Sequence, residues 1–171
     1  MSSTIAKKTM PVAATEALVA KFPETTLAAT DANGIVTVEI PADRLPAVVQ
    51  YLRDDEGYGY LPNIASVDYI ETQQFGMIYH LYRVTDGSRI AVRVLVPRDN
   101  AVVPSITHLF AAADWNEREA FDMMGIAFTG HPNLKRLLMP DNWVGHPLRK
   151  DYVQEQYELP CAFFDKKTTW V

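Results

Sequence analysis

Apolar residues recur along this chain at two spacings, and the spacings separate helices from strands. Residues 43–53 place four apolar side chains at i, i+3, i+4 and i+7 on one helical face: Leu45, Val48, Val49 and Leu52. Asp43 is the candidate N-cap, and Gly57 lies beyond the expected end. Residues 12–22 predict an earlier helix, because Leu18 and Phe22 lie one turn apart with a proline at each edge.

Runs rich in β-branched residues predict the strands. Residues 34–40 follow a turn signal at 31–34, and a shorter strand is expected near 25–29. Residues 65–71 predict a third strand.

A β-hairpin is the clearest local prediction. Residues 76–84 and 89–96 flank an Asp-Gly pair, which is a strong hairpin signal. A two-residue turn at Asp86–Gly87 puts Tyr79 opposite Val94, Leu81 opposite Val92, and His80 opposite Arg93 on the other side of the sheet.

Helical spacing returns after the hairpin. Four residues again share i, i+3, i+4, i+7 spacing, with Pro104 near the first turn: Ile106, Leu109, Phe110 and Ala113. Asp114 is expected to open a second short helix, with Glu117 completing a capping box and Gly125 ending it.

The order of elements predicts an α+β fold: helix, two strands, helix, three strands, then a helical and extended C-terminal docking segment. The sheet is expected to be mixed or antiparallel, with helices on one face. We expect a flexible tail at 1–10, an α+β domain at 11–128, and an extended partner-binding segment at 129–171. That last stretch has little periodicity, so its order is expected to come from a partner surface.

Composition narrows the function classes. The chain has 171 residues, 48% of them hydrophobic, and a net charge of −5, which fits a soluble globular domain and disfavours nucleic-acid binding. Its single cysteine, Cys161, forms no internal disulfide and holds no iron–sulfur cluster by itself. No apolar run approaches the ~20 residues that span a bilayer, and no secretory or transit signal is expected.

Carboxylates gather in residues 114–122. On a helix, Arg118 lies at i, i+4 spacing from Asp114 and from Asp122, and Glu119 lies one turn from Asp122. Three interpretations are open: a solvated ion-paired surface, a docking surface, or a metal or acid–base site. The third is disfavoured because no second helical histidine and no HExxH-like spacing accompany the acids.

The histidines and recognised motifs add no catalytic constellation. We expect His80 to be a cross-strand partner and His108 to be exposed, while His131 and His146 each precede a proline in turn or extended backbone. The chain has no nucleophile elbow, no Walker loop and no Gly-rich dinucleotide fingerprint.

Basic and aromatic residues interleave in 131–151, which fits a protein interface better than nucleic acid on an acidic chain. The late aromatic residues Phe163, Phe164 and Trp170 either fold back on this domain or lie on a neighbour.

A series of spaced motifs now carries a family resemblance: ERE (117–119), FDMMGI (121–126), GHPNLKRLLMP (130–140) and DNWVGHPLRKDY (141–152), approached by VPRDNAVVPSITHLF (96–110). This series resembles the 30-kDa subunit of NADH-quinone oxidoreductase, which is the C subunit of respiratory complex I. One departure is Val153, where many members have proline.

The resemblance implies a non-catalytic peripheral-arm subunit at the cytoplasmic side of the membrane, packed on the neighbouring quinone-site subunit of the 49-kDa type. FMN and iron–sulfur clusters are expected in other subunits and no cofactor in this chain. The implied partner-binding residues are Glu117, Arg118, Glu119, Asp122, His131, Lys135, Arg136, Trp143, Arg149, Lys150, Asp151 and Tyr152.

Two alternatives stay open. The chain could serve a related membrane-bound hydrogenase or a ferredoxin- or F420-dependent complex. In another class, Glu117, Glu119, Asp122 and His131 could serve a stand-alone metal-dependent hydrolase.

Overall fold

The computed structural model describes residues 12–30 and 35–153. Its elements follow one another as α1 (Val12–Lys21), β1 (Thr26–Thr30), β2 (Val36–Ile40), α2 (Leu45–Asp54), β3 (Tyr60–Tyr69), β4 (Gln74–Arg83), β5 (Ser88–Pro97), β6 (Val102–Pro104), α3 (Ala113–Met124) and β7 (Ala127–Thr129). Short 3-10 turns precede α2 and follow β3 and β5. The predicted tail at 1–10, the turn signal at 31–34, and Cys161, Phe163, Phe164 and Trp170 lie outside the described residues.

The main sheet has five strands in the order β1-β2-β5-β4-β3. Neighbours pair antiparallel except β2 and β5, which are parallel, so the sheet is mixed. The chain reaches this order by crossing from β2 through α2 to the far edge and returning through β3 and β4 to β5. The predicted α+β class is confirmed.

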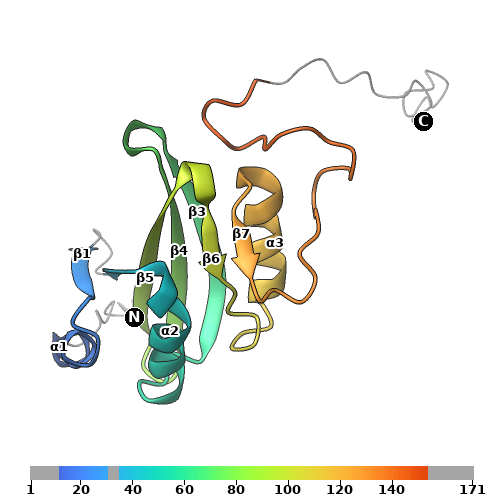
Figure 1. Cartoon of the computed structure of the whole chain (residues 1–171). Helices are drawn as coiled ribbons and strands as arrows, with labels where there is room; N and C mark the ends of the chain where they lie inside the picture. Colours follow the sequence, from blue (N-terminus) through green and yellow to red (C-terminus); the bar gives the residue numbers. More distant parts are fainter. Residues whose placement is uncertain (1–11, 31–34, 154–171) are drawn as a thin grey trace, which may run out of the picture.

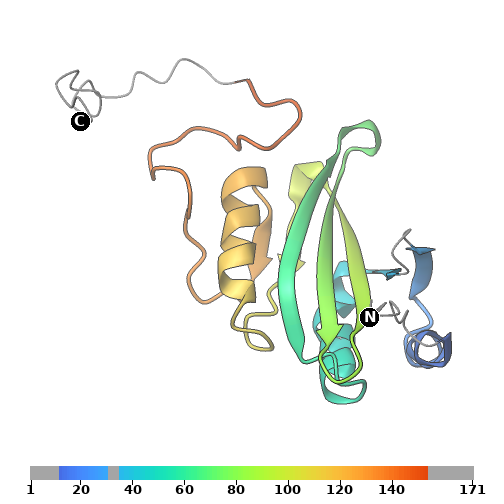
Figure 2. The same ribbon diagram turned by 180° about the vertical axis from the view of Figure 1, so that it is seen from behind.

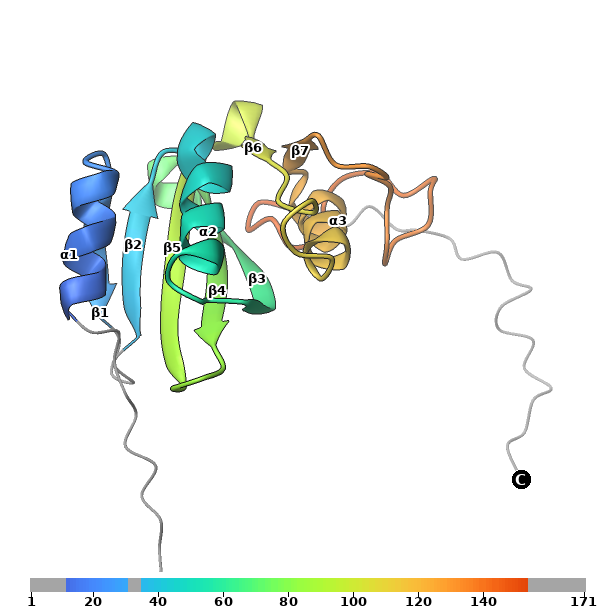
Figure 3. The same ribbon diagram turned by 90° about the horizontal axis from the view of Figure 1, so that it is seen from below.

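The helices are arranged around one face of the sheet. Helix α2 lies across that face, α1 lies toward the β1 edge, and α3 lies beside β3 (Figures 1 and 3). The opposite face carries no helix in the described part of the chain (Figure 2). A small parallel pair, β6 and β7, joins α3 to the rest of the fold.

The core forms between α2 and the sheet, as the apolar spacing of residues 43–53 predicts. All four predicted apolar residues of α2 are fully buried: Leu45, Val48, Val49 and Leu52. They belong to one cluster with strand residues that point to the same face, among them Tyr79 on β4 and Val92 on β5. The predicted cap is wrong, because Asp43 lies in the 3-10 turn 42–44 and makes no capping hydrogen bond to α2.

The predicted hairpin exists, but its register is wrong by two residues. Tyr79 pairs with Val92, His80 with Ala91, and Leu81 with Ile90, since the loop spans four residues, 84–87. The Gly87 N–H donates to the Arg83 carbonyl, and Gly87 takes φ +76°. A shift of two positions keeps every side chain on its predicted face, because side chains alternate with period two.

The predicted helix at 106–113 is also wrong. Ile106 and Phe110 are buried as the spacing indicates, but residues 106–110 form turns and only α3, from Ala113, is helical. The capping box at Asp114 does not form, because the Glu117 side chain accepts a hydrogen bond from the Ile106 N–H instead. Gly125 ends α3 as predicted, with φ +74°.

We predict that Leu52→Ala, which empties a site under α2, lowers the free energy of unfolding by about 2–5 kcal/mol, whereas Leu27→Ala on the exposed strand β1 changes it by less than about 0.5 kcal/mol. Urea unfolding of the two variants measures the difference. Equal losses would contradict the placement of α2 over the sheet.

Candidate functional site

Residues 130–153, which we name the return segment, follow β7 without forming helix or strand. Figure 1 shows this segment in orange, running along α3 and then over its end. Its path is fixed by polar contacts within the chain. Residues 130–153 are thus bonded to their own chain, and the binding of a partner to this segment stays a prediction.

The buried carboxylate of Asp122 makes the central contact. One of its oxygens accepts a hydrogen bond from Arg136 at 2.6 Å, and the other accepts the backbone N–H groups of Leu137, Leu138 and Met139 at 3.0, 2.8 and 2.8 Å. Burial by itself raises the pKa of Asp122, but these donors outweigh it and hold the pKa below its usual value. The ionised carboxylate thus holds residues 136–139 against α3.

Arginines extend this contact along the return segment. Arg136 also donates to the carbonyls of Trp143 and Gly145. These hydrogen bonds close the loop that runs from residue 136 to residue 145. Arg118 donates to the carbonyls of Lys135 and Arg136, while its guanidinium lies over the Trp115 ring. The i, i+4 spacing of Arg118 from Asp114 and Asp122 does not lead to ion pairs in the described residues, because its hydrogen bonds go to backbone carbonyls.

The return segment also caps the C-terminal end of α3. His146 donates to the Asp122 carbonyl at 2.9 Å, the Leu148 N–H to that of Met123, and Arg149 to that of Met124 at 2.7 Å. These carbonyls have no intrahelical partner, and a cation there complements the negative end of the helix dipole. A side chain at Gly125 would meet His146 and Arg149 at 2.5 Å, so glycine is needed for space as well as for conformation.

The far end of the return segment is held to the main sheet. Asp68, on the core side of β3 and 3% exposed, accepts two hydrogen bonds from Arg98 and one from the Lys150 N–H. Arg98 donates as well to Asp151. The guanidinium groups of Arg98 and Arg149 both lie over the ring of Phe75 on β4. These cation–π contacts add to the hydrogen bonds that hold the return segment to the main sheet.

His131, the second residue of the return segment, lies between two carboxylates. The Asn133 N–H donates to its Nδ1, so the imidazole hydrogen lies on Nε2. That atom is 3.2 Å from an Asp114 oxygen and 4.0 Å from a Glu117 oxygen. Burial raises the pKa of Glu117, although the Ile106 N–H and His131 act in the opposite direction.

The twelve predicted partner-binding residues thus separate into two groups. Glu117 and Asp122 are buried, and Arg118, His131, Arg136 and Arg149 bond within the chain. Glu119, Lys135 and Lys150 are exposed, Asp151 is exposed but accepts hydrogen bonds from Arg98, and Trp143 and Tyr152 are half-buried. The surface position expected for Glu117 and Asp122 is wrong; partner contacts by the remaining residues stay a prediction.

Some of these positions carried a signal in the sequence. Ala113, Glu117, Ala120 and Met124 are spaced 4, 3 and 4 residues apart, which places Glu117 inside an apolar helical stripe that is buried. Asp68 falls on the core face of its strand by alternation with Ile64. Arg98 gave no such signal, because its partners at 68 and 151 are remote in sequence.

The return segment exposes several apolar side chains. Large hydrophobic side chains stand exposed there by 54–84%: Leu138, Val144, Leu148 and Val153. Trp115 on α3 adds a further exposed ring at 59%. We name these five residues the apolar row.

The arrangement does not bring the acids together as one reactive centre. Asp122 faces Arg136, Glu117 faces His131, and Glu119 points to solvent. Within residues 12–30 and 35–153, no group of three or more Asp, Glu, His or Cys side chains is placed to hold a metal ion. No helix in the same ranges is long and apolar enough to cross a membrane.

Comparison with known proteins gives consistent results. Residues 38–158 match the family described as respiratory-chain NADH dehydrogenase, 30 Kd subunit. The C subunit of NADH-quinone oxidoreductase from Roseiflexus sp. (strain RS-1) is 44% identical over 151 residues, 86% of this chain and 87% of that protein. The C subunit of NADH-quinone oxidoreductase from Moorella thermoacetica is 48% identical over 113 residues, 66% of this chain and 76% of that protein.

Solved structures show the same fold. A trypsin-resistant fragment of Nqo5 superposes with a TM-score of 0.64 at 30% identity, covering 71% of this chain and 97% of that one. A chain of the membrane-bound sulfane sulfur reductase, an archaeal respiratory membrane complex, gives a TM-score of 0.69 at 21% identity over 93% of this chain and 91% of that one. At that identity the second likeness concerns the fold alone.

We predict that Asp122→Asn, which removes the charge but keeps the shape, lowers the free energy of unfolding by about 3 kcal/mol, because Arg136 and three N–H groups lose a charged acceptor. Urea unfolding measures this loss, and limited proteolysis should cut first within 130–153. Glu119→Gln on the exposed side of α3 is the matched control, expected within about 0.5 kcal/mol of the parent. An equally small change at Asp122 would refute its central role.

A second prediction concerns pH. Burial and the nearby cations Arg149 and Arg136 hold the pKa of His146 below its usual value, although the Asp122 carbonyl favours protonation. The unfolded chain therefore takes up a proton near pH 6.5 that the folded chain takes up only at lower pH, so stability falls as pH drops below about 6.5. His146→Asn keeps a donor for the Asp122 carbonyl but does not titrate, so its melting temperature should fall less between pH 7.5 and pH 5.5.

His108→Asn, at an exposed histidine, is the control for that measurement, and the pH-dependent loss that comes from His146 should remain in it. If the His146 variant follows the parent across this range, His146 is not the group responsible.

Proposed function

This chain belongs to the 30-kDa subunit family of respiratory-chain NADH dehydrogenase, and from that premise we propose that it is a non-catalytic peripheral-arm subunit that docks through the outer side of its return segment. Its family places it in a respiratory NADH-quinone oxidoreductase-type complex. The proposed neighbour is the quinone-site subunit of the 49-kDa type. In this role the chain supports electron transfer from NADH to quinone, coupled to proton transport, from the cytoplasmic side of the membrane.

The apolar row is the observation that carries this proposal. Large apolar side chains that stay exposed along one internally bonded segment favour a site of interaction. The backbone beneath them is held by Asp122, Arg136, His146 and Arg149, so the row is presented in a fixed arrangement. A preformed surface loses little conformational freedom on binding, which favours stable association.

Exposed charges on α3 and the return segment suit a protein partner. Glu119, Lys135 and Lys150 are exposed on α3 and the return segment, with both signs represented. Charged side chains at the rim of an apolar contact set orientation and partner choice more than strength. We therefore propose that the apolar row provides most of the binding affinity for the partner. The three charged residues would set the orientation in which the partner binds.

The electron donor and the cofactors are proposed on the same basis. Relatives 43–48% identical to this chain are named as subunits of NADH-quinone oxidoreductases, which favours NADH over hydrogen, ferredoxin or F420 as the source of electrons. FMN and iron–sulfur clusters are assigned to other subunits.

We predict that the double change Val144→Asp and Leu148→Asp lowers the amount of this chain in the native complex at least about tenfold, because two charges would be buried in an apolar contact. The measurement is extraction of membranes in mild detergent, a native gel, and quantification of the tagged chain in the band that holds the flavin, cluster and membrane subunits.

Val84→Asp is the matched control, since Val84 is 70% exposed at the hairpin tip, away from the return segment. It should assemble like the parent. A double variant that folds in isolation and still assembles in full amount would exclude the return segment as the docking surface. A parent chain that runs alone would exclude the proposed function itself.

A further inference from the structure

The sheet face opposite α2 is a second candidate surface. In the described residues no helix covers it (Figure 2), and its side chains come from alternate positions of β3, β4, β5 and β2. Its middle holds small or apolar residues, Ala65, Ile78 and Ala91, all on the same face by register. The return segment bonds to β3 at Asp68, whose side chain points to the core side of the sheet. The surface of the return segment is therefore separate from the sheet face opposite α2.

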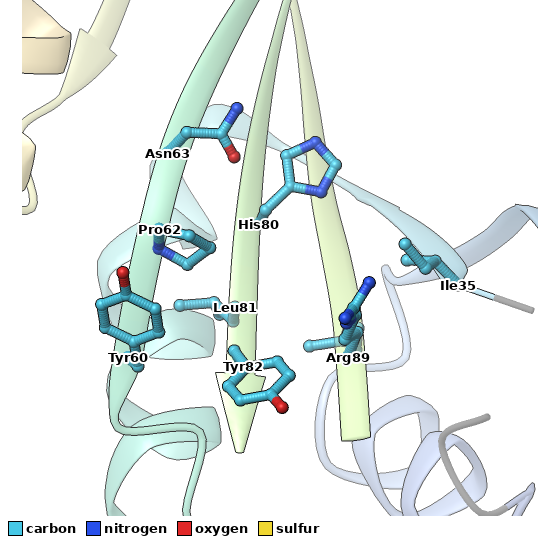
Figure 4. Close-up of a pocket in the computed structure, with 9 residues that line it drawn as sticks. Ile35, Tyr60, Pro62, Asn63, His80, Leu81, Tyr82 and Arg89 are labelled. Atoms are coloured by element: carbon cyan, nitrogen blue, oxygen red, sulfur yellow. The ribbon is translucent and has the colours of Figure 1, made fainter. Parts of the chain in front are cut away.

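A cavity of about 380 Å³ opens at one end of this face. Figure 4 shows its side chains: Tyr60 and Asn63 on β3, His80 and Tyr82 on β4, Arg89 on β5, and Ile35 just before β2. Tyr60 and Tyr82 meet edge to face with ring centroids 6.3 Å apart, and Tyr60 is 53% exposed at the rim. A volume of this size can enclose one large side chain.

The charges of the cavity have one sign. The Arg89 guanidinium lies 5.5 Å from the centre of the Tyr82 ring, and no carboxylate among the described residues pairs with it. The cavity lining contains no Asp or Glu. Farther along this face, Glu39 pairs with Arg93 at 2.6 Å. A cationic site therefore stands on a chain whose net charge is −5.

We propose that this cavity receives an acidic side chain, Asp or Glu, carried by a segment of a second neighbouring subunit. Its carboxylate pairs with Arg89, with Asn63 as a further donor, and its aliphatic part packs against Tyr60, Tyr82 and Ile35. This proposal depends on the proposed function in one respect: the neighbouring subunit comes from the multisubunit complex to which the chain is assigned.

Charge selects this occupant over the alternatives. A second copy of this chain docking face to face would bring two Arg89 side chains together, which like-charge repulsion disfavours. A nucleic acid requires several phosphate contacts, and this face offers one exposed arginine.

The test places a photoreactive benzoylphenylalanine at position 60 of the tagged chain in cells, where it replaces Tyr60 at the rim of the cavity. After irradiation and extraction of the intact complex, mass spectrometry identifies the cross-linked peptide. We expect a segment of another subunit with an Asp or Glu within about five residues of the cross-link. Arg89→Gln should lower the cross-link yield about tenfold, whereas Asn100→Asp, an exposed site with the same change of charge, should not.

A charge exchange supplies the decisive control. Arg89→Glu should abolish the cross-link, and changing the identified acidic residue to Lys should restore it. The proposal is overturned by a cross-link within the same chain or to another copy, by a segment without an acid, by a yield that Arg89→Gln leaves unchanged, or by no cross-link in an intact complex. In each case the tagged chain still migrates with the complex, which separates this failure from failure of the proposed function.

Discussion

The ionised carboxylate of Asp122 is the contact on which the C-terminal third of this structure depends. It lies inside the protein with one oxygen on Arg136 and the other on three successive backbone N–H groups. A buried charge is costly unless it is fully bonded, and here every bond comes from the return segment. Helix α3 and the return segment are therefore mutually dependent: the helix supplies the charge and the segment supplies the donors.

This dependence explains how a segment without helix or strand presents a defined surface. The polar groups that fix its path face inward, toward Asp122, the α3 carbonyls and Asp68. Three of its large apolar side chains, Leu138, Val144 and Leu148, remain more than half exposed in the described part of this chain. The arrangement is typical of a subunit that completes its hydrophobic contacts only on assembly. The uncovered sheet face, with its cationic cavity, gives the chain a second surface in another direction.

Sequence patterns predicted the parts of the fold that depend on local burial. The stripe from Leu45 to Leu52, the strands on both sides of the hairpin and the end of α3 at Gly125 all follow from spacing or backbone conformation. The hairpin register was missed because Asp-Gly occurs in four-residue as well as two-residue loops. Here Asp86 accepts hydrogen bonds from Arg83 and the Ser88 N–H, which favours the longer loop.

The sequence pointed to residues 117–152 as the candidate site but did not predict the contacts among them. Motifs in 117–152 identified the family, and apolar periodicity identified the helices, because both are properties of residues close together in the chain. Tertiary structure alone decided that Asp122 meets Arg136, that Arg98 joins Asp68 to Asp151, and that Arg118 bonds to backbone carbonyls rather than to the acids beside it. The physical reason is that the sequence shows which residues are charged and therefore need a bonding partner when they are buried. Which residue becomes that partner depends on the distant segments that the fold brings within hydrogen-bond distance.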